Sequence, residues 1–297
     1  MSQRTNGRDI SVSVGLPVRN GARFLAETLD SLLAQSYADF ELLIADNAST
    51  DETPEIGRAY AARDPRVRFL RSEVDLGLAG NYNRIFHESR GKYFKWAAAD
   101  DLHEPDYLKR CVEVLDRDPS VVLAYGKSRF IDENGKPVEE TDPGFDLQDE
   151  AAPERLRYVI RSKRWVNAIF GLIRSEALAR TPLLPKYPSG DYIILGELAL
   201  LGKFVEVPEV LFLRRLHPGA SSQNLNDANW LAHFWNGGKS GVDGRLVLWS
   251  RSRGHAGTIM RSDLTVGEKV SLSGSLLRTM VTRRKRLLAE LRSKMFS

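Results

Sequence analysis

Two adjacent carboxylates, Asp100 and Asp101, follow a short apolar stretch at 93–97. Neighbouring carboxylates repel each other unless a cation or hydrogen-bond donors stabilise them. Mg²⁺ and Mn²⁺ prefer oxygen ligands and often bridge a protein carboxylate to substrate phosphates. The pair therefore predicts a divalent-metal site or, in the simpler interpretation, a cap for a helix that starts near Pro105.

A second polar segment, Asp-Asn-Ala-Ser-Thr-Asp at 46–51, also follows an apolar stretch. Short polar side chains at such a point can hydrogen-bond a base or a ribose. Thr50 and Asp51 are explained as well by the capped start of a helix that has Pro54 in its first turn. Asp46 fits that interpretation less well, because it lies directly at the end of the apolar stretch.

A third segment, 75–83, has glycines at 77 and 80, which allow close approach at a helix entrance whose N-terminus attracts anions. The chain contains neither G-x-G-x-x-G nor G-x-x-x-x-G-K-[ST]. A dinucleotide fingerprint and a P-loop are therefore not supported.

The elements that must position these side chains alternate between strand and helix. Strands are predicted at 10–16, 40–45, 67–70 and 93–97, with helical spacing between them. This alternation is typical of an α/β domain with a parallel sheet, and ligands of such sheets bind beyond the carboxyl ends of the strands. Further on we expect helices at 105–115, 153–161 and 191–201, strands at 121–131 and 204–213 (the second interrupted by Pro208), and a mobile acidic loop at 137–153.

Composition excludes several classes of protein. Of the 297 residues 42% are apolar and one is cysteine, which excludes a disulfide scaffold, and no run of about 18 apolar residues or signal-peptide pattern is present. We therefore expect a cytoplasmic protein. The net charge of +4 is unevenly distributed along the chain. Residues 239–297 hold 13 Lys/Arg and 4 Asp/Glu, whereas residues 1–238 have a net negative charge. This distribution, without any matching motif, disfavours a nucleic-acid-binding module.

Together these segments resemble the inverting family-2 glycosyltransferases. The likeness rests on Leu-Pro-Val-Arg-Asn-Gly at 16–21, Glu27, the helix ending at 29–37, and 40–51, and it continues through Gly-Lys-Tyr at 91–93 to Asp100-Asp101 and Pro105-Asp106. It covers about residues 10–217. The resemblance implies a GT-A fold, that is, a Rossmann-like mixed sheet flanked by helices, in residues 1–225, with a basic helical extension in 226–297. It also implies a nucleotide-diphospho-sugar donor and a divalent cofactor, Mn²⁺ or Mg²⁺.

The resemblance further implies roles for single residues. Pro17, Arg19, Asn20 and Asp46 fall where the family holds the nucleotide, with Asp46 near the base. Asn83 falls on an asparagine that lines the donor pocket.

The remaining roles concern the reaction itself. Asp100 falls on the last Asp of the family's Asp-x-Asp motif, at metal and diphosphate, with Asp101 and His217 as further metal ligands. Arg215 is implied to meet the diphosphate. Asp191, in Ser-Gly-Asp-Tyr at 189–192, takes the place of the catalytic base, although the residues alone indicate an N-cap equally well.

One departure keeps other functions open. Ala98 stands where the first Asp of the motif belongs, which leaves a catalytically silent sugar-nucleotide-binding or scaffold protein as an alternative. A nucleotidylyltransferase is less favoured, since its Gly-rich loop after the first strand is missing. The processive Gln-x-x-Arg-Trp motif is absent, which predicts transfer of one sugar to a glycan, a lipid-linked or another acceptor in surface polysaccharide or glycoconjugate synthesis.

The last segment, 264–297, has apolar residues at helical spacing with many Arg and Lys between them. A basic amphipathic helix of this kind indicates peripheral binding to an anionic membrane, or packing on the protein's own body. Both interpretations stay open at this point.

Overall fold

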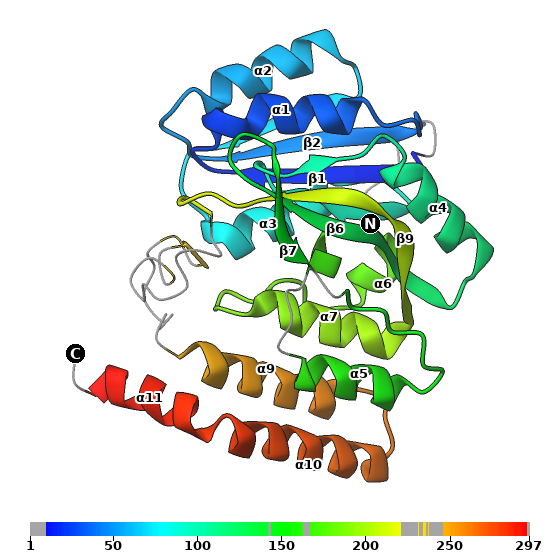
Figure 1. The fold of residues 1–297 in the computed structure, drawn as a ribbon, viewed down its shortest axis with the longest axis vertical. Helices are drawn as coiled ribbons and strands as arrows, with labels where there is room; N and C mark the ends of the chain where they lie inside the picture. Colours follow the sequence, from blue (N-terminus) through cyan, green and yellow to red (C-terminus); the bar gives the residue numbers. More distant parts are fainter. Residues whose placement is uncertain are drawn as a thin grey trace.

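The computed structural model describes residues 10–141, 144–162, 167–220 and 246–295, together with residues 231, 234, 235 and 237. Figure 1 shows a twisted mixed sheet with helices on both faces and further layers of helices below it. This confirms the predicted fold class. The predicted domain boundary between 225 and 226 lies outside the described residues.

The first half of the sheet is parallel. β1 (Val12–Val18) lies between β2 (Phe40–Asn47) and β4 (Tyr93–Trp96), and β3 (Val67–Ser72) pairs with β2. All residues of β1, β2 and β4 are buried, as expected for parallel strands covered on both faces. The four strands confirm the predicted alternation.

The second half is mixed and begins where β8 (Leu172–Arg174) pairs antiparallel with β4. β6 (Val121–Ile131) and β9 (Lys203–Arg215) run parallel to each other, and β5 (Leu102–His103) closes the edge antiparallel to β9. The sequence did not predict β5 and β8, because two or three residues are too few to show a periodicity.

Two apolar cores lie on opposite faces of the sheet. One face is covered by α1 (Ala22–Leu33), α2 (Thr53–Arg63) and α4 (Tyr107–Arg117), and the other by α3 (Gly77–Glu88), α6 (Ser175–Ala179) and α7 (Gly190–Leu201). A short 3₁₀ helix spans Asn167–Phe170.

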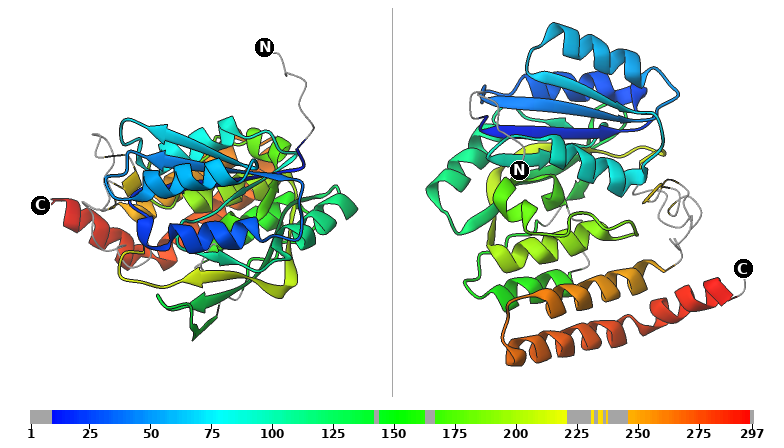
Figure 2. Two further views of the ribbon diagram at one scale, coloured as in Figure 1. Left: turned by 90° about the horizontal axis from the view of Figure 1, so that it is seen from above. Right: turned by 180° about the vertical axis from the view of Figure 1, so that it is seen from behind.

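Beyond α7 the C-terminal helices form further layers (Figures 1 and 2). α5 (Ala152–Arg161) and α9 (Val247–Arg261) pack on α7, and α10 (Val266–Thr282) continues into α11 (Arg284–Met295) along the outside. In the described part of the chain no helix is both long and apolar enough to cross a membrane.

Three sequence-based predictions were wrong in detail. The segment predicted as a mobile loop begins with β7 (Pro137–Thr141), which pairs with β6, and Leu147 bridges to Phe204. β9 is not interrupted at Pro208, because its register with β6 shifts there and absorbs the proline in a bulge. Helix α7 begins at Gly190, so Asp191 lies in its first turn and is not its N-cap.

Candidate active site

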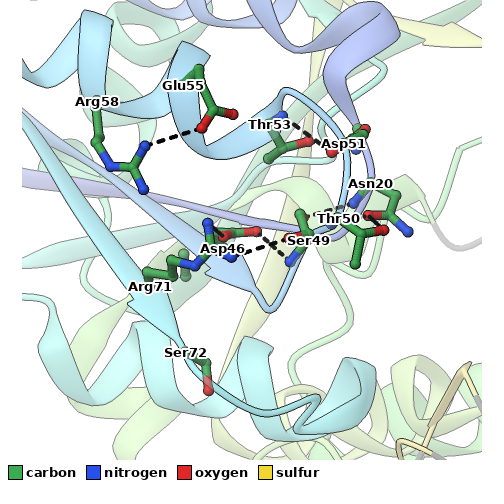
Figure 3. A network of polar contacts seen from close by, with 12 residues as sticks. Asn20, Asp46, Ser49, Thr50, Asp51, Thr53, Glu55, Arg58, Arg71 and Ser72 are labelled. Carbon is green, nitrogen blue, oxygen red and sulfur yellow. Dashed lines mark hydrogen bonds and ion pairs between the residues drawn. The ribbon is translucent and has the colours of Figure 1, made fainter.

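The loops that follow β1 and β2 are hydrogen-bonded to each other (Figure 3). The Oδ1 atom of Asn20 accepts from the backbone N–H of Thr50 at 2.9 Å, and the N–H of Asn20 donates to Oγ of Ser49 at 2.8 Å. Asn20 and Ala48 both have left-handed backbones, with φ of 52° and 57°. Asn20 therefore shapes the predicted nucleotide site, in a conformation that asparagine tolerates better than most residues.

Asp51 joins the starts of two helices in the same network. Its Oδ2 accepts from the N–H of Ala22 and its Oδ1 from the N–H of Thr53, both at 3.1 Å. Partial burial opposes ionisation, yet the hydrogen bonds from Thr53 and Ala22 lower the pKa of Asp51. The helix-start interpretation is thus confirmed for Asp51.

Asp46 lies at the carboxyl end of β2 and is fully buried. Its Oδ1 accepts from the N–H of Ser49 at 3.1 Å, while its Oδ2 lies 3.6 Å from Nη1 of Arg71 and has no hydrogen-bond partner among the described residues. Arg71 also donates to the carbonyl of Ser49 (Figure 3). The contact of Asp46 with a base stays a prediction.

The remaining predicted donor residues lie around this loop. Pro17 is buried in β1 opposite Ala45, whereas Arg19 is exposed and forms an ion pair with Asp75 at 3.2 Å. Asp75 also accepts from Nδ2 of Asn47 at 2.8 Å. The Asn47–Asp75 pair was missed from sequence, because nothing in the pattern showed that the loops after β2 and β3 meet.

Asn83, on α3, uses its amide within the protein. Its Nδ2 donates to the carbonyl of Leu184 at 2.9 Å and its Oδ1 accepts from the Leu184 N–H at 3.0 Å. Leu183, which precedes Leu184 in the chain, has a left-handed backbone with φ of 61°. Asn83 therefore fixes the segment before α7, and its contact with a donor stays a prediction.

The end of β9 brings Arg215 and His217 to the Asp100–Asp101 turn. Nε2 of His217 lies 2.9 Å from Oδ2 of Asp100, and the His217 ring packs on the ring of Phe24 at 4.8 Å. Asp101 instead accepts the backbone N–H of Arg215 at 2.8 Å. Of the three predicted metal ligands, the structure thus pairs Asp100 with His217 and turns one Asp101 oxygen toward the backbone.

The fit of a divalent ion depends on this pair. Within the described residues no three His, Cys, Asp or Glu side chains are placed to hold a metal ion. Asp100 and His217 supply one carboxylate and one imidazole, and Mg²⁺-type ions commonly use one or two protein ligands and complete their shell with substrate phosphates and water. The pair fits an ion that arrives with a diphosphate.

Arg215 is almost completely buried, with 1% of its side chain exposed. Its Nη2 donates to Glu27 at 2.7 Å, its Nε to the carbonyl of Asp100 at 2.8 Å, and its Nη1 to the carbonyls of Asp132 and Glu133. The guanidinium therefore connects α1, the β4–β5 turn and the β6–β7 turn.

Asp101 and Lys95 are buried behind the turn. Burial, helped by the neighbouring Asp100 carboxylate, raises the pKa of Asp101 to about 8. Lys95 donates to the carbonyl of Phe170 and lies 4.2 Å from the centre of the Tyr107 ring, and burial lowers its pKa to about 7. Two buried ionisable side chains, Asp101 and Lys95, therefore lie at or behind the Asp100–Asp101 turn.

Asp191 lies in the first turn of α7. Burial raises the pKa of Asp191, while the N–H of Tyr192 at 2.9 Å and the charges of Arg251 and Arg214 oppose that shift. Burial and then the charges of Asp100, Asp101 and Asp191 raise the pKa of Tyr82. The charges of Asp100, Asp101 and Asp191 therefore all act on Tyr82.

Sequence reasoning missed several residues of this centre, namely Glu27 as a partner of Arg215, together with Tyr82, Lys95, Arg214 and Arg251. Each lies on an ordinary helix or strand, and its place at the site results from pairing between distant segments. For Lys95 a signal existed, because a lysine within an otherwise apolar strand, Tyr-Phe-Lys-Trp at 93–96, is unusual.

The chain is similar in sequence to known glycosyltransferases. The model of the family described as "Glycosyl transferase family 2" matches residues 13–186. The chain is 32% identical over 231 residues to an uncharacterised glycosyltransferase of Rickettsia typhi, covering 76% of this chain and 70% of that protein. It is 33% identical to a chondroitin synthase of Escherichia coli over 124 residues, which span 42% of this chain and only 18% of the synthase.

Solved structures show the same fold. S. aureus TarS, residues 1–349, in complex with UDP-GlcNAc superimposes with a TM-score of 0.69 at 17% identity, covering 95% of this chain and 79% of that one. The mannosyltransferase PcManGT from Pyrobaculum calidifontis, in complex with GDP-Man and Mn²⁺, gives a TM-score of 0.56 at 19% identity over 96% of this chain and 87% of that one. At these identities the likeness concerns the fold.

Proposed function

The chain belongs to glycosyl transferase family 2, and we propose that it transfers one sugar from a nucleotide-diphospho-sugar to an acceptor hydroxyl with inversion. The observation that carries this proposal is the placement of Asp100 beside His217 at 2.9 Å, in a fold whose relatives bind UDP-GlcNAc and GDP-Man. Family membership also makes a nucleotidylyltransferase the poorer interpretation.

Asp191 is the proposed base. An inverting displacement needs one carboxylate that takes the proton of the acceptor hydroxyl as the hydroxyl attacks the anomeric carbon. The first turn of a helix stabilises the ionised carboxylate, while burial keeps it more basic than an exposed aspartate. Asp191 combines both properties.

The departing nucleoside diphosphate gains negative charge as the bond to the sugar breaks. We place it beside Asp100 and His217, which would hold Mn²⁺ or Mg²⁺, and a bound ion of this type neutralises diphosphate oxygens. Arg214, whose positive charge acts on both Asp101 and Asp191, adds to this field. Arg215 is assigned a positioning role, because its side chain is buried and bonded to Glu27 and three carbonyls.

The nucleotide is proposed to lie over the loops after β1 and β2, against Arg19, Asn20 and Asp46, where the Ser49–Asn20 network fixes the backbone. The Oδ2 atom of Asp46, which forms an ion pair with Arg71 but no hydrogen bond within the described residues, is proposed as an acceptor for a base N–H. The proposed acceptor is a glycan or a lipid-linked molecule. The proposed process is synthesis of a surface polysaccharide or glycoconjugate at the cytoplasmic side of a membrane.

Two measurements test the function. A thermal-shift screen of UDP-, GDP- and dTDP-sugars identifies the donor, because a ligand that binds the native state raises Tm. With that donor, Asp191→Asn should lower turnover by about 10²- to 10⁴-fold and keep the donor-induced shift. Asp118→Asn, at the end of α4, serves as the matched control and should keep full activity.

The silent-binding alternative predicts a different result. A protein without catalysis would show the thermal shift but no donor hydrolysis or transfer, with Mn²⁺ or with chelator. Full turnover by Asp191→Asn would instead reject the assignment of the base.

A further inference from the structure

The outer surface of α10 and α11 carries an apolar stripe that no described part of the protein covers. It consists of Val266, Val270, Leu277, Val281, Leu288 and Met295, which are 53% to 79% exposed. Successive members are four or seven residues apart, a spacing that keeps side chains on one face within each helix. The step from Val281 to Leu288 crosses the junction between α10 and α11. Figures 1 and 2 show the two helices following one another along the edge of the molecule.

The opposite face of the same helices provides the packing. Leu272 and Leu276 are buried against Leu156, Ile160 and Ile259, and Arg283 donates to the carbonyls of Arg161 and Ser162 at the end of α5. The Thr265–Glu268 capping box fixes the start of α10. The residues of the stripe therefore do not contribute to the packing of α10 and α11 on the rest of the described protein.

The charge around the stripe is positive from Leu277 onward, whereas Asp263 and Glu268 lie near its first member, Val266. Exposed cations on the same two helices are Arg278, Arg284, Lys285, Arg286, Arg292 and Lys294. The single carboxylate between residues 269 and 295 is Glu290, which is turned inward and accepts from the N–H groups of Leu248 and Trp249 at the start of α9. From residue 269 to 295 the described part of this face thus offers apolar side chains and positive charge without an outward carboxylate.

We propose that this face docks on an anionic lipid surface, with the stripe in the headgroup–acyl boundary and the cations on the lipid phosphates. A second copy of the chain is the poorer occupant, because pairing two such faces would bring their like charges together. The proposal does not depend on sugar transfer and is tested by binding alone.

The test is flotation of the full chain with vesicles of phosphatidylglycerol and phosphatidylcholine in equal parts, against phosphatidylcholine alone. We expect binding to the anionic vesicles only, weakened in high salt. The apolar variant Leu277→Ser/Val281→Ser/Leu288→Ser and the cation variant Arg284→Gln/Lys285→Gln/Arg292→Gln should each lose it, the latter by about a hundredfold. Arg58→Gln/Lys109→Gln/Arg117→Gln, which removes three exposed cations from α2 and α4, should bind as the unchanged protein does.

Three results would overturn the proposal. The unchanged protein fails to float with anionic vesicles, or the control variant loses as much binding as the cation variant, or the apolar variant floats normally, which would indicate attraction to any polyanion. Light scattering without lipid adds a check: a dimer that dissociates in the apolar variant would assign the stripe to a second copy. Circular dichroism establishes that each variant keeps its helices.

Discussion

The Nη2 atom of Arg215 lies 2.7 Å from Oε2 of Glu27, although the two residues are 188 positions apart. The arginine is buried and the glutamate half-exposed. Arg215 also donates to the backbone carbonyl of Asp100. The position of the arginine therefore helps to fix the backbone of Asp100.

A change at Glu27 tests this positioning role. Glu27→Gln keeps the shape and removes the charge, which we expect to lower kcat by about tenfold with little change in donor KM, since the diphosphate is not contacted. Steady-state kinetics measures both constants. Glu55→Gln, an exposed glutamate on α2, is the control. A rise in KM at unchanged kcat would instead indicate that Arg215 binds the donor directly.

The acidic limb of the pH profile reports on Asp191. A base must be ionised to act, and burial raises the pKa of Asp191, so activity should fall at a higher pH than for an exposed aspartate. Arg251 lies over the Tyr192 ring at 3.4 Å and opposes this shift. Removing its charge in Arg251→Met raises the pKa further, which should lower kcat several-fold at acidic pH and leave the alkaline plateau unchanged.

The control for that profile is Arg253→Met, an exposed arginine two residues along the same helix. It should reproduce the unchanged profile. An acidic limb that stays in place in Arg251→Met would contradict the electrostatic link between α9 and the base.

Metal affinity can be tested at Ala98, which is partly exposed just ahead of Asp100. Ala98→Asp restores the first carboxylate of the family's motif beside Asp100. An added oxygen ligand should lower the Mn²⁺ concentration for half-maximal activity by about tenfold. Metal titration after chelation measures this, with Ala98→Asn as the uncharged control. Equal titration curves for Ala98→Asp and the unchanged protein would place the ion elsewhere.

The buried charge of Lys95 should lower the free energy of unfolding at neutral pH. Its pKa is lowered to about 7 in the folded protein from 10.5, so between these values the unfolded chain binds more protons and stability rises with pH. Lys95→Met, which removes the buried charge, should raise Tm by about 3 °C at pH 7 and flatten that rise. Thermal melts from pH 7 to 10 measure this, and the exposed Lys109→Met is the control. A lower Tm with the pH dependence kept would show that the bond to Phe170 outweighs the burial of charge.

The sequence by itself determined the local elements and the family likeness. The β-branched strands, the helical spacing and the motifs through Asp101 are local patterns, and they predicted the parallel half of the sheet and the place of Asn20, Asp46 and Asp100. Spacing along the chain also predicted the amphipathic C-terminal helices, because a helical face needs only its own periodicity.

Only the tertiary structure decided which side chains meet. The pairing of β9 with β6 places Arg215 and His217 at the Asp100 turn, and the packing of α9 on α7 places Arg251 over the ring of Tyr192, the residue next to Asp191. The structure also showed that α10 packs with one face and exposes another. Such contacts join segments more than 50 residues apart, and they depend on the burial of whole helices and strands, which no local pattern of residues records.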